Sequence, residues 1–252
     1  MKPLFYTIVV LFGMFASAQN ESLFEEGNTL YSNGKYYEAI EKYEDVLNSG
    51  YHSAEVYFNL GNAHYKLNRI APSIFYYEKA LQLAPNDKEI LNNLSFAQNM
   101  TIDAIETVPE IGISKFLRKI INTFHFDSWA YLSVLFMVLF IILFISYYFA
   151  SYTGKKRFAF VSSFISIFLT LLFLSFAFKK QKMDNKDNPA IVFSQEALVR
   201  TDPNLSGEEA FRLHEGTKVQ VIDTINNWAE ILLVDGKTGW IVTDNIKLLK
   251  KF

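Results

Sequence analysis

Two apolar stretches decide the fold of this chain: residues 129–150, WAYLSVLFMVLFIILFISYYFA, and residues 158–178, FAFVSSFISIFLTLLFLSFAF. Neither contains a charged residue. A helix of about 20 residues, rising 1.5 Å per residue, matches a bilayer core about 30 Å thick. Backbone amides in lipid must be satisfied within the segment, so the pair predicts two transmembrane helices joined by the short loop 151–157. The outer ends of this hairpin are then expected on one side of the membrane.

The composition narrows the function classes. The chain has 252 residues, of which 50% are apolar and 16% aromatic, and its formal net charge is -2. Without a basic excess, nucleic acid is not expected as a partner. Cysteine is absent. This excludes disulfides, thiolate metal sites and a cysteine nucleophile.

Residues 1–18 have the pattern of a secretory signal peptide. Lys2 precedes an apolar run, and Ala16-Ser-Ala18 offers a small-residue cleavage site. The alternative is an uncleaved anchor. In both cases the chain is expected to be exported from Gln19 to the first span and returned by the second span, with both flanking domains on the periplasmic side of the bacterial inner membrane. The distribution of basic residues does not agree with this orientation. Positive charge favours the cytoplasmic side, yet the outer flanks of the hairpin carry more basic residues than loop 151–157. We give the signal peptide precedence, since the first segment usually sets the orientation.

Residues 20–100 contain a repeat with a period of 34 residues. The period aligns Gly27 with Gly61, Asn28 with Asn62, Ala39 with Ser73, Tyr43 with Tyr77 and Leu47 with Leu81. Together with Pro85, which ends a helix, this pattern resembles the tetratricopeptide repeat. The first copy is looser and the third fades after Ala97, so we expect two repeats and a closing helix that acts as a cap.

The resemblance implies a concave groove, lined by the first helix of each repeat, that binds an extended peptide. The groove candidates are Phe24, Asn28, Tyr31, Phe58, Asn59, Asn62, Tyr65, Asn92 and Asn93. Relatives that clamp a peptide carboxylate combine asparagines with basic residues, yet Phe24, Glu89 and Asn93 stand where the basic ones are expected. The sequence therefore favours an uncharged or basic peptide.

Residues 101–127 are predicted to form a hinge and an amphipathic juxtamembrane helix. Apolar side chains recur at helical spacing from Ile113 to Phe124, and Lys115, Arg118 and Lys119 occupy the other face. Two interpretations stay open. The helix lies among lipid headgroups, or its apolar stripe packs on the repeat array.

Residues 190–250, after a polar linker at 179–189, change to short strand patterns. Asp235-Gly236 between two β-rich runs predicts a hairpin, and about five short strands suggest a small barrel. The order of motifs resembles bacterial SH3-like domains, which implies binding of cell-wall peptides or proteins. The candidates for a binding face are Arg200, Trp228 and Trp240, although an aromatic residue at Trp240 commonly fills a barrel core.

We find no motif for catalysis. Phosphate-binding loops, zinc-protease helices, nucleophile elbows and dinucleotide fingerprints are absent from the sequence, and the four histidines lack ligand spacing. Neither a transport role, which calls for ionisable residues inside the spans, nor an enzyme is expected. We expect no cofactor and no metal site.

The order of parts resembles the BatE-type proteins of the Bat aerotolerance operon. The predicted fold class is a multi-domain membrane protein with a tetratricopeptide array, a two-helix hairpin and an all-β SH3-like barrel. The resemblance implies envelope partners that include membrane-bound von Willebrand A-domain proteins and a MoxR-type ATPase, and a role in stress tolerance. Two hypotheses follow: a membrane-anchored adaptor that holds envelope proteins, or a sensor whose barrel binds peptidoglycan.

Overall fold

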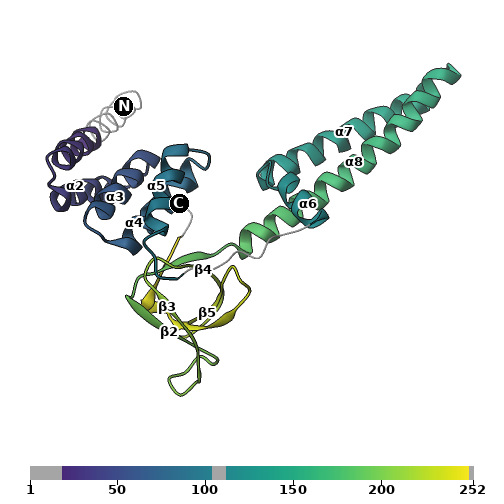
Figure 1. Ribbon diagram of the computed structural model, residues 1–252. Helices are drawn as coiled ribbons and strands as arrows, with labels where there is room; N and C mark the ends of the chain where they lie inside the picture. The colour runs from purple at the N-terminus through teal and green to yellow at the C-terminus, as the bar shows by residue number, and fades with distance from the viewer. Residues whose placement is uncertain (1–18, 104–111, 250–252) are drawn as a thin grey trace, which may run out of the picture. The chain divides into compact units, whose positions relative to one another are not determined.

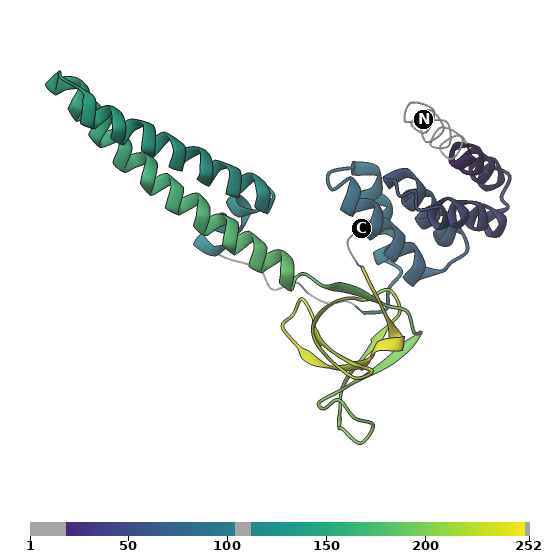
Figure 2. The ribbon, with the colours of Figure 1, turned by 180° about the vertical axis from the view of Figure 1, so that it is seen from behind.

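The computed structural model describes residues 19–103 and 112–249 (Figures 1 and 2). The predicted signal peptide therefore lies outside the described residues. The chain divides into two compact units. One contains residues 1–107 together with 188–252, and the other contains residues 108–187. The first unit is built from two segments that are far apart in the sequence.

The first segment forms an array of helices, as predicted. Residues 19–32 are helical, followed by α2 (Tyr36–Asn48), α3 (Ala54–Lys66), α4 (Ile70–Leu83) and α5 (Lys88–Gln98). Ser53 begins α3 by accepting a hydrogen bond from the backbone N–H of Val56, and Asp87 caps α5 in the same way. Such caps satisfy amide groups that the first turn of a helix leaves unpaired.

Glycines allow the paired helices of each repeat to approach closely. A Cβ atom on Gly27 would lie 2.5 Å from the ring of Tyr43, and one on Gly61 would lie 2.6 Å from the ring of Tyr77. Both tyrosines are almost fully buried. The 34-residue period therefore reflects one packing arrangement used twice.

The second segment forms a curled antiparallel sheet (Figure 1). Its strands are β1 (Pro189–Val192), β2 (Glu196–Arg200), β3 (Glu209–His214), β4 (Lys218–Ile225), β5 (Trp228–Leu232), β6 (Thr238–Val242) and β7 (Ile246–Leu248). The strand order is β3-β2-β6-β5-β4-β1-β7. The Asp235-Gly236 turn connects β5 to β6 as expected, and Gly236 adopts the left-handed φ of 92°. The sheet has seven strands where the sequence suggested about five.

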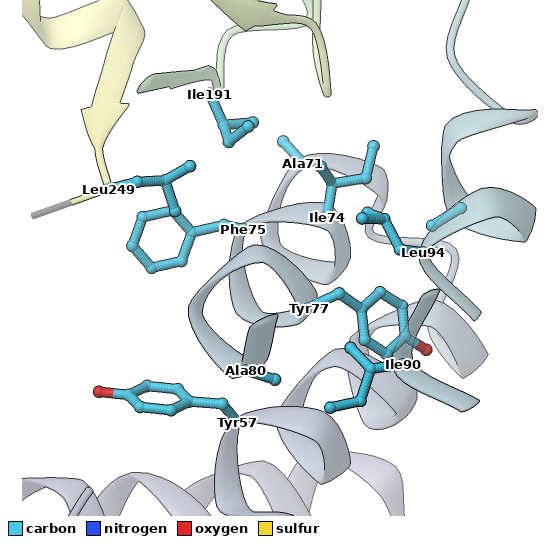
Figure 3. Close-up of a cluster of buried hydrophobic side chains, with 11 residues drawn as sticks. Tyr57, Ala71, Ile74, Phe75, Tyr77, Ala80, Ile90, Leu94, Ile191 and Leu249 are labelled. Carbon is cyan, nitrogen blue, oxygen red and sulfur yellow. The ribbon is translucent and has the colours of Figure 1, made fainter. Parts of the chain in front are cut away.

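The repeat array and the sheet share a hydrophobic core. Ile191 of β1 and Leu249, which follows β7, pack in the same cluster as Ile74 and Phe75 of α4 (Figure 3). Phe193 adds an edge-on contact with Phe75, with ring centroids 5.8 Å apart. The sheet is therefore docked on the second helix of the second repeat, a contact that the separate sequence motifs did not predict.

Polar contacts surround this shared core. Asp103 accepts hydrogen bonds from the backbone N–H of His214 at 2.7 Å and from Thr217 Oγ1 at 2.6 Å, and its carboxylate lies 2.7 Å from His214 Nδ1. Burial alone would raise the pKa of Asp103, but these hydrogen bonds together lower it. Lys218 pairs with Glu78 of α4 at 2.7 Å. These contacts fix the sheet in one orientation on the array.

Among its described residues, the second unit contains three helices: α6 (Ile113–Ile121), α7 (Phe126–Phe149) and α8 (Thr153–Lys186). By length and composition, α7 and α8 are able to cross a membrane. Residues 179–186, expected in a polar linker, continue α8 instead. They contain no proline or glycine, so nothing in the sequence ends the helix at the limit of its apolar segment.

Small hydroxyl residues join α7 to α8. Ser133 Oγ donates to the carbonyl oxygen of Thr170 at 3.1 Å, and Ser166 Oγ donates to that of Phe136 at 2.8 Å. Ser162, Ser166 and Thr170 are spaced four residues apart in the sequence, which predicts that they share this face. The buried set is Ser163, Ser166 and Thr170. Close approach of small residues is typical of helix pairs in lipid.

Candidate functional site

The predicted groove residues gather on the first helix of each repeat, and we call this set the repeat face. It comprises Phe24, Asn28, Tyr31, Phe58, Asn59, Asn62, Tyr65 and Asn93. All eight are partly exposed, whereas Asn92 is exposed. Partial exposure leaves them accessible to a ligand while the array holds their backbones in place.

Two copies of one hydrogen-bond network organise the asparagines. Asn28 Oδ1 accepts from Tyr43 Oη and from Asn59 Nδ2, both at 2.9 Å. Thirty-four residues later, Asn62 Oδ1 accepts from Tyr77 Oη at 2.7 Å and from Asn93 Nδ2 at 2.9 Å. Burial raises the pKa of both tyrosines, so they remain neutral donors.

This network links consecutive repeats. Asn28 belongs to the first repeat and Asn59 to the second, and the pair Asn62 and Asn93 continues the series into α5. The carbonyl oxygens of Asn28 and Asn62 are thereby committed to the array. The asparagines thus position the face as well as offering amide groups to a ligand.

A cavity of about 280 Å³ lies at the amino-terminal end of the repeat face. It is lined by Asn20, Glu21, Phe24, Tyr51, Ser53, Glu55 and Val56. Two carboxylates and two aromatic rings suit a positively charged side chain, which gains both ion pairing and contact with ring faces. The lining therefore agrees with the expectation of an uncharged or basic peptide.

Sequence reasoning missed Phe96 as a member of the repeat face. It stands 34 residues after Asn62 and 68 after Asn28, so it occupies the same position in the third copy. Its side chain is 51% exposed on α5. The 34-residue period aligns Phe96 with Asn28 and Asn62, but the third copy has phenylalanine in place of asparagine at this position.

The candidate residues of the sheet divide into two environments. Trp228 is buried, with 6% of its surface exposed, whereas Trp240 is partly exposed. Burial therefore leaves little of Trp228 accessible to a ligand. Arg200 is partly exposed, and its guanidinium donates to the carbonyl oxygen of Gly207 at 2.6 Å.

Register places Arg200 and Trp240 next to each other. Trp240 of β6 pairs with Arg200 of β2 on one side and with Glu230 of β5 on the other. Directly opposed residues of neighbouring strands project from the same face. We call Arg200, Trp240 and Glu230 the sheet face; its acidic member was not predicted from sequence.

In the two described ranges, no group of three or more His, Asp or Glu residues could hold a metal ion. His64 lies on α3, where a histidine either packs in the array or faces the groove. The structure buries it against Tyr76, with ring centroids 5.3 Å apart. Its role is packing.

Comparison with known families agrees with this architecture. Residues 27–68 match the family described as TPR repeat, and residues 54–87 match the tetratricopeptide repeat. Residues 196–247 match the bacterial SH3 domain. No curated protein is significantly similar to the chain. The prediction of a helical repeat array and a small SH3-like domain is confirmed.

Proposed function

We propose that this chain is a membrane-anchored scaffold of the bacterial envelope, which binds a protein segment on its repeat face and performs no catalysis of its own. Tetratricopeptide repeats are typically non-catalytic modules of protein interaction. The observation that carries the proposal is the repeat face itself, with eight partly exposed aromatic and amide side chains supported by a repeated hydrogen-bond network.

The cavity at the end of the repeat face supports a particular ligand chemistry. Glu21 and Glu55 supply negative charge beside the rings of Phe24 and Tyr51. A peptide segment that places a lysine or arginine there and lays uncharged residues along the asparagines fits both parts. The basic residue of the peptide would then determine which of its other residues lie against the asparagines.

The shared core supports a hairpin topology. The array before α7 and the sheet after α8 pack together through Ile191 and Leu249, so both must lie on one side of any membrane that the hairpin crosses. An even number of crossings satisfies this requirement. The side is the periplasm if the predicted signal peptide directs export.

The order of parts supports membership of a Bat-type aerotolerance or stress complex. In that setting the partners are membrane proteins with von Willebrand A domains, and the scaffold holds them beside the bilayer. The hairpin contributes anchoring, since residues 129–150 and 158–178 contain no ionisable group for transport.

Site-specific crosslinking tests the scaffold. A photoreactive amino acid replaces Phe58 on the repeat face of the intact protein. The protein is crosslinked in its own membrane, and the captured proteins are identified. The matched control replaces Tyr37, which is 58% exposed on α2 outside the repeat face. We expect specific partners at position 58 that are lost in Glu21→Gln and Glu55→Gln variants. Identical capture at both positions would contradict the proposal.

A second function, binding of peptidoglycan, is favoured by the row Arg200, Trp240 and Glu230. An indole between opposite charges offers stacking and hydrogen bonding to a wall peptide. The experiment measures how much of the solubilised chain sediments with isolated cell wall. It compares the unchanged chain with the Trp240→Ala variant. Leu205→Ala is the control, since Leu205 is 78% exposed between β2 and β3. Retention that depends on Trp240 and not on Leu205 supports the sensor.

A further inference from the structure

The helix α6 has an apolar side that the hairpin covers only in part. Ile121 is fully buried, and Leu117 and Ile120 are partly buried. In contrast, Ile113 is 79% exposed and Phe116 is 64% exposed. The amino-terminal half of the stripe therefore lacks a cover in the described residues.

The carboxyl-terminal end of α6 is fixed at the start of the apolar stretch of α7. The indole N–H of Trp129 donates to the carbonyl oxygen of Ile121 at 3.0 Å, and Phe124 contacts the same indole edge-on at 5.1 Å. Lys180 of α8 donates to Asn122 Oδ1 at 3.2 Å. Tryptophan and lysine at these positions are typical of the boundary between lipid and water. Thus α6 joins the hairpin at the point where the apolar surface of the hairpin begins.

Charge distinguishes the opposite side of α6. Lys115, Arg118 and Lys119 lie on that side, and the stretch from Gly112 to Phe126 contains no acidic residue. A basic, one-sided helix complements a surface of anionic phosphates. A protein partner would need a groove that is both apolar and acidic, beside the bilayer.

We propose that α6 lies in the plane of the membrane surface, with Ile113 and Phe116 inserted among acyl chains and with Lys115 and Lys119 paired to anionic lipid phosphates. The partner surface is an anionic phospholipid bilayer. This inference rests on the proposed anchoring of the hairpin and adds a second, lipid-selective contact to it. The contact holds the last turn before α7 parallel to the surface.

The absence of cysteine from the chain permits a direct measurement of depth. The full chain is reconstituted into phosphatidylcholine vesicles with and without phosphatidylglycerol, after an environment-sensitive fluorophore has been attached to Phe116→Cys. The matched control is Lys115→Cys on the opposite side of the same turn. Brominated lipids quench probes within the bilayer, and iodide quenches probes in water.

We expect lipid quenching at position 116 to be several-fold stronger than at position 115, and to decrease when phosphatidylglycerol is omitted or salt is raised. Equal quenching at both positions would overturn the proposal, as would quenching at 116 that ignores lipid charge. Protection of position 116 from both quenchers would also overturn it, in favour of a protein cover. Extraction at alkaline pH separates the two proposals: release of the chain shows that the hairpin does not anchor it, whatever the probe reports.

Discussion

At the scale of single residues, Gly61 allows α3 and α4 to approach each other closely. The ring of Tyr77 occupies the space that a side chain at position 61 would need, and the Tyr77 hydroxyl is held by Asn62 at 2.7 Å. The ring cannot move aside without breaking that hydrogen bond. The glycine of the repeat is therefore required by packing and not by backbone conformation.

We predict that Gly61→Ala destabilises the repeat array. Overpacking of this kind costs about 1–3 kcal/mol, more than the gain of up to about 1 kcal/mol from the better helix propensity of alanine. Thermal unfolding of the solubilised chain measures the change. Gly154→Ala is the control, because a Cβ there meets nothing within 4 Å. Equal stability of the two variants would show that the Tyr77 contact is not tight.

His64 is the most unusual ionisable residue of the array. It is 5% exposed, and neither ring nitrogen has a hydrogen-bond partner among the residues that the structure describes. Burial lowers the pKa of His64 to about 4, and the positive charges of Arg69 and Lys247 act in the same direction. An unfolded chain instead binds the proton near the ordinary pKa of 6.5.

The sign of the pH effect follows from this difference. Above pH 6.5 both states are neutral, and between pH 6.5 and about 4 only the unfolded state binds a proton, so stability falls as pH falls. The loss amounts to at most about 3 kcal/mol. We predict that His64→Phe keeps the stacking on Tyr76 and removes this loss. Hydrogen exchange of α3 and α4 from pH 7 to pH 4.5 measures it, with exposed His125→Gln as the control that retains the slope.

At the scale of elements, the turn between β3 and β4 docks the sheet on α4. Gly216 has a left-handed φ of 88°, and a Cβ on it would lie 2.7 Å from Thr101 Cγ2 and 3.0 Å from the side chains of Ile70 and Ile74. Only glycine meets both requirements at once. The Glu215-Gly216 pair, which the sequence indicates only as a turn, is thus part of the contact between the domains.

We predict that Gly216→Ala loosens the docked sheet, whereas Gly236→Ala does not. Both glycines share the left-handed conformation, but a Cβ on Gly236 meets nothing within 4 Å, so the comparison isolates the contact with α4. A zero-length carbodiimide crosslink between Glu78 and Lys218, which lie 2.7 Å apart, reports docking. Its yield should fall in Gly216→Ala only. A similar fall in both variants would assign the effect to turn strain.

At the scale of the whole molecule, the hairpin is an insertion within one folded unit. The chain leaves the first unit after Asp103, which is bound to the sheet through His214 and Thr217, and returns at β1. The two ends of the insertion are therefore held on the same domain. For the proposed membrane anchor, two crossings are the simplest arrangement that returns the chain to its own side.

We predict that positions 51 and 205 label from the same side of the membrane and position 156 from the other. Single cysteines replace Tyr51 and Leu205, both well exposed, and the exposed Lys156 near the start of α8. An impermeant maleimide is applied to right-side-out and inside-out vesicles. Labelling of positions 51 and 205 from opposite sides would contradict the shared core.

The sequence by itself indicated the main structural segments and their order. Apolar length indicated α7 and α8, the 34-residue period indicated the array and its candidate face, and Asp235-Gly236 indicated a hairpin, because each signal depends on neighbouring residues alone. These signals are local, and local backbone and solvation preferences are sufficient to produce them.

Only the tertiary structure decided which surfaces meet. Trp228 and Trp240 are both aromatic residues of β-strands, but the folded chain buries the first and leaves the second partly exposed. Ile191, Gly216 and Leu249 carry no sequence signal for docking, because their partners on α4 lie more than 100 residues away in the chain. Burial is a property of two surfaces together, so the joining of the array and the sheet into one unit became visible only when both were folded.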